Sequence, residues 1–247
     1  MPEKTAPLLN VENVSVSYDG ANPVIHDINM APQAGEFYGL IGLNGAGKTT
    51  LIKAILGLRE QDAGKIEIFG KPCTDQEAKK NLAFLPERFE PPWFLSGLEF
   101  LRFSMRLYGQ RVEDKVFYEY AEKVALDPDA LKRRVQTYSK GMRQKLGLLG
   151  TVLTNCKLLI LDEPMSGLDP KARTLVKDML LEIKAADRTV FLSSHILADM
   201  DEICDRVSVM HNGTIGFSGP PKDLKQQTGC KNLERAFLHF IEKPAAA

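Results

Sequence analysis

The segment Gly42–Thr49 reads GLNGAGKT and fits the phosphate-loop pattern, a glycine and four residues before Gly-Lys and a Ser or Thr. In such a loop, glycines let backbone N–H groups converge on phosphate oxygens, and the N-terminus of the following helix favours negative charge. Lys48 is expected to reach the β and γ phosphates, and the Thr49 hydroxyl to ligate Mg²⁺. The alternative is a glycine-rich turn with an incidental lysine. The residues expected to bind the nucleotide here are Gly42, Asn44, Gly45, Ala46, Gly47, Lys48, Thr49 and Thr50.

A second candidate site follows the apolar segment LLILDEP, residues 158–164. A buried strand of this kind would carry Asp162 and Glu163 at its carboxyl end, where open α/β sheets bind ligands. Asp162 would hold Mg²⁺ through its water shell, and Glu163 would orient or deprotonate an attacking water. Alone, an Asp-Glu pair after a strand is more often a plain turn. Together with the phosphate loop it favours nucleotide hydrolysis.

The elements that position these residues follow from hydrophobic periodicity. Residues 8–18 alternate like an edge strand, and the segment from Glu36 changes from an apolar strand through the glycine turn into a helix beginning near Lys48. From about Glu87 to Leu149 the pattern is helical, which indicates an insertion. Strand and helix then alternate again, with strands at LLILDEP and TVFLSS and a helix between them. Such apolar strands with amphipathic helices predict a mostly parallel sheet covered on both faces.

Composition sets limits on the class of protein. The 247 residues are 44% apolar, and 32 basic residues balance 32 acidic ones, which argues against coating nucleic acid or anionic lipid by bulk charge. The four cysteines form no CxxC pair and look like reduced cysteines of a cytosolic protein. The N-terminus has no secretory signal, and no uncharged stretch approaches the ~20 residues that cross a bilayer. Any membrane crossing is therefore expected from another subunit.

Five motifs occur here in the order and spacing of one family. The phosphate loop, YSKGMRQKL, LLILDEP, SGLD at 166–169 and SSH at 193–195 resemble the nucleotide-binding subunit of ABC transporters, over about Leu8 to Leu224. The resemblance implies an α/β fold: a P-loop NTPase core with a mainly parallel sheet, an N-terminal antiparallel β subdomain and an inserted α-helical signature subdomain. It implies one ABC ATPase domain over 1–247, with an ATP-binding core at 1–86 and 151–225, a helical subdomain at 87–150 and a C-terminal tail at 226–247.

The resemblance also assigns roles to single residues. Tyr18 stands where the family stacks an aromatic ring on adenine, and His195 where a histidine contacts the γ phosphate and helps hold Glu163 and the water. Asp169 lies in the loop that crosses the dimer interface, and Ser139 and Gly141 face the ATP bound by a second copy. The alternatives are a packed strand tyrosine, a structural histidine, and a plain turn with Pro170 at the first helical position. The catalytic residues implied are Glu163, His195 and Lys48.

Two departures from the family pattern stand out. Glu87 in LPERFE replaces the usual glutamine, and a carboxylate oxygen still suits Mg²⁺, so the metal ligands expected are Thr49, Asp162 and Glu87. Lys140 and Met142 replace Gly and Gln of the common LSGGQ signature. The segment SKGMRQ is similar to the signature of bacterial exporters whose ATPase and permease are separate chains.

The function implied is an ATP-hydrolysing subunit that binds ATP and Mg²⁺ and powers an exporter. Its expected partners are a second copy or a paralogous ATPase, head to tail, and a transmembrane permease, at the cytoplasmic face of the inner membrane; no nucleic acid is expected. The surface around Trp93 would receive a permease helix, or Trp93 would simply pack the subdomain. The alternatives are an importer ATPase and a soluble, non-transport ABC ATPase. The transported compound cannot be derived from this chain.

Overall fold

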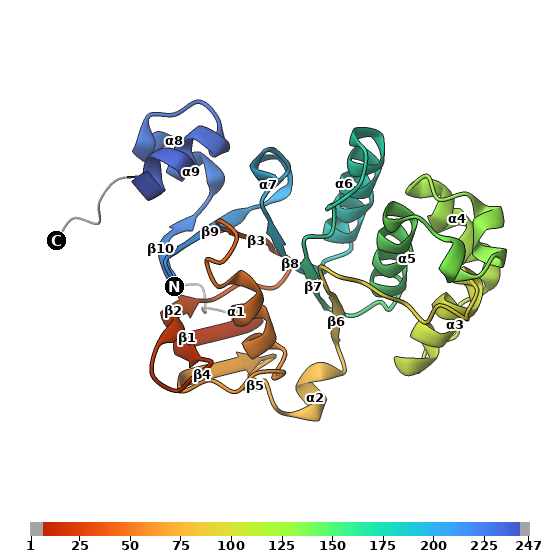
Figure 1. Cartoon of the computed structure of the whole chain (residues 1–247), viewed down its shortest axis with the longest axis horizontal. Helices are drawn as coiled ribbons and strands as arrows, with labels where there is room; N and C mark the ends of the chain where they lie inside the picture. Colours follow the sequence, from red (N-terminus) through yellow and green to blue (C-terminus); the bar gives the residue numbers. More distant parts are fainter. Residues whose placement is uncertain (1–6, 243–247) are drawn as a thin grey trace. The chain divides into compact units, whose positions relative to one another are not determined.

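The computed structural model describes residues 7–242, whose helices and strands are labelled in Figure 1. These residues divide into two compact units. The first comprises the chain up to Lys79 and from Thr189 onward, and the second comprises Lys80–Arg188. The phosphate loop belongs to the first unit and the LLILDEP segment to the second.

The first unit contains an antiparallel sheet in the order β2 (Pro23–Met30), β1 (Leu9–Ser17), β4 (Ala63–Ile68) and β5 (Lys71–Pro72). The expectation of an edge strand at residues 8–18 is wrong, because β1 pairs with β2 on one side and β4 on the other. Its alternating pattern shows only that one face is buried, since backbone pairing leaves no mark on side-chain type. The sheet confirms the predicted antiparallel β subdomain.

The parallel strands of the first unit place two candidate residues side by side. Strand β3 (Phe37–Ile41) lies between β8 (Thr189–Ser194) and β9 (Arg206–His211), parallel to both, and β10 (Thr214–Gly219) runs antiparallel to β9. All residues of β3 and β8 are buried, as their apolar runs predict. Ile41 pairs with Ser194, so the next residues along the two strands, Gly42 and His195, leave the sheet at the same edge.

Five helices complete this unit: α1 (Lys48–Ile55), α2 (Gln76–Lys79), α7 (Leu197–Ile203), α8 (Pro221–Thr228) and α9 (Leu233–Glu242). Helix α7 packs against both α8 and α9, so the C-terminal helices are packed onto this unit.

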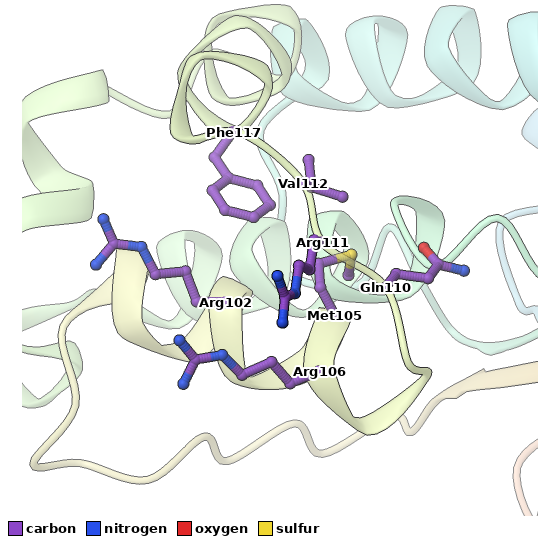
Figure 2. Close-up of a pocket in the computed structure, with 7 residues that line it drawn as sticks. All are labelled: Arg102, Met105, Arg106, Gln110, Arg111, Val112 and Phe117. Carbon is purple, nitrogen blue, oxygen red and sulfur yellow. The ribbon is translucent and has the colours of Figure 1, made fainter.

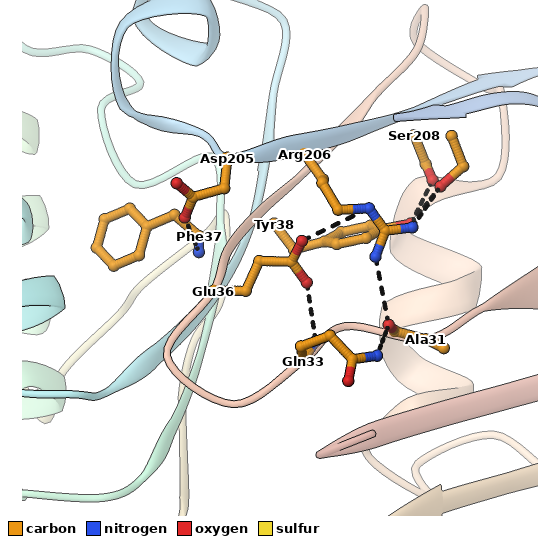
Figure 3. Close-up of polar contacts among 9 residues, drawn as sticks. Ala31, Gln33, Glu36, Phe37, Tyr38, Asp205, Arg206 and Ser208 are labelled. Carbon is orange, nitrogen blue, oxygen red and sulfur yellow. Dashed lines mark hydrogen bonds and ion pairs between the residues drawn. The ribbon is translucent and has the colours of Figure 1, made fainter. Parts of the chain in front are cut away.

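Buried polar groups fix the amino end of β3, away from the phosphate loop (Figure 3). The Tyr38 hydroxyl lies 2.5 Å from the Ser208 hydroxyl and 3.0 Å from that of Ser218, and the Arg206 guanidinium lies over the Tyr38 ring. Arg206 is also 3.5 Å from a carboxylate oxygen of Glu36. Burial raises the pKa of Glu36, partly offset by a hydrogen bond from the Gln33 N–H and by the Arg206 charge. Satisfied polar groups of this kind hold β3, β9 and β10 in one register.

The second unit is mainly helical. Strands β6 (Leu82–Leu85) and β7 (Leu158–Asp162) pair in parallel. The helices are α3 (Gly97–Leu107), α4 (Asp114–Lys123), the 3-10 helices η1 (Pro128–Lys132) and η2 (Val135–Thr137), α5 (Lys140–Val152) and α6 (Pro170–Ala185). Helix α3 begins with a capping box, in which Ser96 and Glu99 bond each other's backbone N–H groups. The helices between β6 and β7 confirm the predicted helical insertion and, with the two kinds of sheet, the α/β fold class.

Among residues 7–242, no helix is both long enough and apolar enough to cross a bilayer.

Candidate functional site

The Lys48 side chain folds back onto the carbonyl groups of its own phosphate loop. The Lys48 side chain is 8% exposed, and its ammonium donates hydrogen bonds to the carbonyl oxygens of Gly42 at 2.9 Å and Leu43 at 3.3 Å. The Ala46 N–H closes the turn on the Leu43 carbonyl at 3.1 Å. These bonds hold the Lys48 charge inside the loop, where a phosphate would meet it.

The backbone of this loop requires glycine. Gly47 has a φ of 107°, and a Cβ at this residue would lie 2.4 Å from the Ile25 side chain. Gly47 is the N-cap of α1 and gives no side-chain cap, and no acidic residue occupies the first turn. The positive end of the helix dipole therefore faces the loop with no acidic side chain in the first turn of α1 to neutralise it. Such a terminus is suited to bind an anion.

His195 lies beside this loop. It is exposed, directly follows β8, and lines a pocket of about 140 Å³. The other residues lining the pocket are Gly42, Leu43, Asn44, Leu197 and Phe237. The structure thus brings three predicted residues together, namely Gly42, Asn44 and His195. Phe237, in α9, was not predicted, because its only sequence signal is the apolar face of a short helix.

Tyr18 directly follows β1, and 56% of its surface is exposed. Its hydroxyl lies 3.3 Å from the Thr50 hydroxyl in the first turn of α1. The alternative of a packed strand tyrosine does not describe a side chain this exposed. The first unit therefore places Tyr18, Thr50 and the phosphate loop along one helix terminus.

Asp162 and Glu163, the two carboxylates predicted at the end of a buried strand, lie at the end of β7. Asp162 is 2% exposed and Glu163 6% exposed, and Glu163 has a φ of 51°. That left-handed conformation is unusual for a residue with a side chain, and such residues concentrate at functional sites. The Glu163 carbonyl accepts hydrogen bonds from the Ser166 N–H at 3.1 Å and from the buried Gln144 amide at 3.3 Å.

Gln144 is the last residue of the SKGMRQ signature segment, but its contact with Glu163 was not predicted. It lies in α5, and its amide also donates to the Pro164 carbonyl at 3.2 Å. The helix that begins within the signature therefore supports the backbone of Glu163. The sequence signal that could have identified Gln144 is a polar residue within a buried helical segment.

Glu87 and Asp162 lie at one edge of the same strand pair. Leu85 pairs with Leu161 in the parallel β6–β7 register, so both carboxylates follow the carboxyl ends of neighbouring strands. Glu87 itself is exposed. No group of three or more His, Cys, Asp or Glu side chains within residues 7–242 is arranged to hold a metal ion, and the set Thr49, Asp162 and Glu87 stays a prediction.

The signature segment forms an exposed helix terminus. Ser139 is the N-cap of α5, and its hydroxyl accepts the Met142 N–H at 3.2 Å. A Cβ at Gly141 would lie 3.5 Å from the Gly167 carbonyl and 3.7 Å from the Leu168 side chain, so the signature adjoins the SGLD loop.

Asp169, at the end of that loop, is the N-cap of α6 and accepts the Ala172 N–H at 2.9 Å. This hydrogen bond, together with the charge of Lys145, lowers the pKa of Asp169. Pro170 occupies the first turn of α6, so the helix-start reading of SGLDPKA holds for this chain.

A separate pocket of about 510 Å³ lies in the second unit between α3 and α4 (Figure 2). Met105 and Phe117 form an apolar floor, and the guanidinium groups of Arg102, Arg106 and Arg111 surround it. Arg102 is paired with Asp114. None of the predicted nucleotide-binding residues lines this pocket.

Trp93 also belongs to the second unit. It is 64% exposed and meets Phe94 edge to face at 5.7 Å. The alternative that Trp93 merely packs the subdomain does not fit a side chain this accessible.

Comparison with known proteins gives a consistent result. Residues 25–166 match the family described as ABC transporter. An uncharacterized ABC transporter ATP-binding protein of Synechocystis is 38% identical over 78% of this chain, and the chain spans only 55% of that relative's length. A fluoroquinolones export ATP-binding protein of Mycobacterium tuberculosis is 34% identical, over 88% of this chain and 72% of its own.

A solved structure described as the ATP-binding subunit of an ABC transporter also resembles the chain. It superposes with a TM-score of 0.83 at 32% identity, over 94% of this chain and 99% of that one.

Proposed function

This chain is an ATP-binding subunit of the ABC transporter family, and we propose that it hydrolyses ATP to power export through a separate transmembrane permease. The observation that carries the proposal is the phosphate loop, with Lys48 held over its carbonyls and with Gly42, Asn44 and His195 lining one pocket. An anion-binding loop beside a histidine is suited to a triphosphate whose terminal phosphate is to be released.

The first unit supplies the nucleotide contacts in this proposal. Glycine N–H groups and the N-terminus of α1 hold the phosphates, and Lys48 neutralises charge on the β and γ groups. The Thr49 hydroxyl would ligate Mg²⁺, since hydroxyl and carboxylate oxygens are the donors that this ion prefers. Tyr18 stacks on adenine, and His195 contacts the γ phosphate.

The motifs of the second unit supply the carboxylates of this proposal. Asp162 and Glu87 would hold Mg²⁺ through carboxylate oxygens, and Glu163 positions the attacking water and accepts its proton. The water oxygen bonds to the γ phosphorus as the bond to the ADP oxygen breaks. The support for Glu163 is its left-handed backbone, fixed by hydrogen bonds to its carbonyl, which restricts where the carboxylate points.

A second copy, or a paralogous ATPase, completes each site. Ser139 and Gly141 of one chain clamp the γ phosphate bound by the other, and Asp169 links the two sites across the interface. Closure then requires ATP, because ADP lacks the group that the clamp holds, and hydrolysis releases the dimer. The exposure of Ser139 at a helix N-terminus supports this role.

Export is favoured over import by two observations. The signature reads SKGMRQ instead of the common LSGGQ, and an export ATP-binding protein of M. tuberculosis is 34% identical over most of the chain. We place the protein at the cytoplasmic face of the inner membrane, with the permease on the exposed aromatic surface around Trp93 and Phe94. An importer remains the second candidate.

The central test is Glu163→Gln in the full chain. The amide keeps the size of the side chain but cannot take a proton, so phosphate release should fall about 100-fold or more while ATP binding and ATP-dependent dimer formation persist. Glu122→Gln, at an exposed position of α4, is the matched control. Rapid phosphate release by Glu163→Gln would refute the assigned role.

The transport direction needs a separate experiment. The chain is purified from membranes with its associated permease, reconstituted into vesicles, and ATP is supplied on the side that carries this subunit. Movement of the substrate away from the ATP side supports export. Movement toward the ATP side establishes the importer, and a ribosome or DNA in place of a permease establishes a soluble ABC ATPase.

A further inference from the structure

The Tyr18 ring has a cation on one of its faces. The Arg59 guanidinium carbon lies 4.7 Å from the ring centroid, within the ~6 Å at which a guanidinium and an aromatic face attract each other. Arg59 Nη2 also donates a hydrogen bond to the Ser17 carbonyl at 2.5 Å, one residue before the tyrosine. Arg59 therefore contacts both the ring and the backbone that carries it.

Arg59 is itself fixed by the turn after α1. Its backbone N–H donates to the Lys53 carbonyl at 3.2 Å. Its Nε atom is buried and has no hydrogen-bond partner among the residues that the structure describes. A buried N–H without a partner is unfavourable, so the guanidinium sits here in spite of that atom. The ring contact and the bond to Ser17 decide its position.

Asp62 also fixes the backbone next to the contact between Arg59 and Tyr18. Its carboxylate accepts the Ser17 hydroxyl at 2.7 Å and the Ser17 N–H at 2.5 Å. The two hydrogen bonds from Ser17, and to a lesser extent the charge of Arg59, lower the pKa of Asp62. Ser17 is thus held from both sides, which leaves Tyr18 little freedom to turn away.

We infer that Arg59 is a positioning residue that holds the Tyr18 ring ready to stack on the adenine of ATP. The Tyr18 hydroxyl is fixed at the other end, 3.3 Å from Thr50. With one face against Arg59, the exposed surface of the ring belongs to its opposite face and its edges. That face is the one offered to the base.

Two physical effects give Arg59 this influence. A ring that is already ordered loses less conformational freedom when the base binds. The cation also draws π electron density toward its own face, so the opposite face repels the adenine π cloud less. Both effects act on the base and neither acts on the phosphates. The inference rests on the proposed adenine contact of Tyr18.

Calorimetric titration of the full chain, in EDTA to prevent hydrolysis, tests the inference with two probes. ATP carries the base, and inorganic tripolyphosphate lacks it. Arg59→Met should raise the Kd for ATP about three- to tenfold and leave the Kd for tripolyphosphate unchanged. Arg59→Lys, which keeps a cation, should recover part of the loss. Lys71→Met, an exposed charge removal elsewhere in the first unit, should change neither affinity.

A double-mutant cycle separates positioning from a general effect on the fold. Tyr18→Ala should weaken ATP binding at least as much as Arg59→Met, and adding Arg59→Met to it should cost nothing further, because the ring is gone. If Arg59→Met does not fold, Arg59→Gln replaces it, since it removes the charge and keeps a donor for the Ser17 carbonyl.

Each unfavourable outcome has its own meaning. Additive losses, equal losses for ATP and tripolyphosphate, or tighter ATP binding by Arg59→Met would each overturn the inference, the last because Arg59 would then be occupying the place of the base. If Tyr18→Ala leaves ATP affinity unchanged, the proposed adenine contact itself fails. If Tyr18→Ala weakens binding and Arg59→Met does not, only the role of Arg59 fails.

Discussion

The phosphate loop of the first unit and the signature segment of the second both lead into a helix, and the two helix starts are built differently. Gly47 offers α1 no side-chain cap, and Lys48 is buried against the carbonyls of its own loop. Ser139 caps α5 with its own hydroxyl, and both Ser139 and Lys140 are exposed. One helix start has no side-chain cap, and the other is capped by its own serine hydroxyl.

This difference suggests how the two motifs divide their work. A loop that is pre-shaped around an anion site binds without help, because its backbone and lysine are already in place. A capped and exposed helix start has a lower affinity for phosphate by itself. It therefore adds a contact only when another molecule brings a bound phosphate to it. Variants of each motif should therefore fail in different ways.

Within this comparison, the largest effect is expected from Ser139→Arg, which puts a bulky side chain on the exposed helix start. ATP binding by the monomer should stay within about twofold, whereas dimer closure should be lost and hydrolysis should fall about 100-fold. Calorimetry, light scattering with ATP and a phosphate-release assay measure the three quantities.

Two further variants are compared with Ser139→Arg, one with the opposite expected pattern and one as a control. Lys48→Met should lose ATP binding in the monomer, which is the opposite pattern. Gln136→Arg, an exposed residue just before the signature, should behave like the unmodified chain. If Ser139→Arg weakens monomer binding as strongly as Lys48→Met does, the contrast between the two motifs is wrong.

A smaller effect is expected from Gln144→Leu. The change removes the hydrogen bonds to the carbonyls of Glu163 and Pro164, so Glu163 is held less firmly. Hydrolysis should fall about tenfold with ATP affinity nearly unchanged, because a misplaced catalytic group affects the rate and not the binding.

Thr151→Val is the matched control, since Thr151 is a buried polar residue of α5 whose hydroxyl donates to the Gly147 carbonyl of the same helix. Thermal unfolding shows whether the two variants lose similar stability. Equal hydrolysis rates for both would mean that Gln144 has no role beyond the fold.

The smallest effect is expected from Asp169→Ala, which removes the N-cap of α6. The loss of the bond to the Ala172 N–H should lower the Tm by about 2–4 °C at pH 7. Asp178→Ala, on the exposed face of the same helix, should lower it less.

The effect of Asp169 should also depend on pH. Because the folded state lowers the pKa of Asp169, its contribution is complete above the ordinary aspartate value of about 3.9 and is lost as the pH falls through the folded value. The difference in Tm between the unmodified chain and Asp169→Ala should therefore shrink as the pH is lowered from about 4 toward 2. A difference that grows in acid would contradict the capping role.

Local chemistry explains what could be predicted from the sequence. The glycine turn before α1, the start of α1 at Lys48, the strand ending at Asp162 and the helical insertion depend on glycine spacing and on hydrophobic periodicity, and the structure confirms them. The edge position of residues 8–18 could not be predicted, because alternation records which face is buried and not how many neighbours a strand has.

The sequence by itself determined the family, the phosphate loop and the order of the motifs, because these depend on residue types at fixed spacing. Only the tertiary structure decided that Gln144 supports Glu163, that Phe237 lines the pocket beside His195, and that Arg59 lies on Tyr18. The physical reason is that each of these contacts joins residues far apart in the chain. Tertiary packing brings these residues into contact, and a local sequence pattern does not predict such a contact.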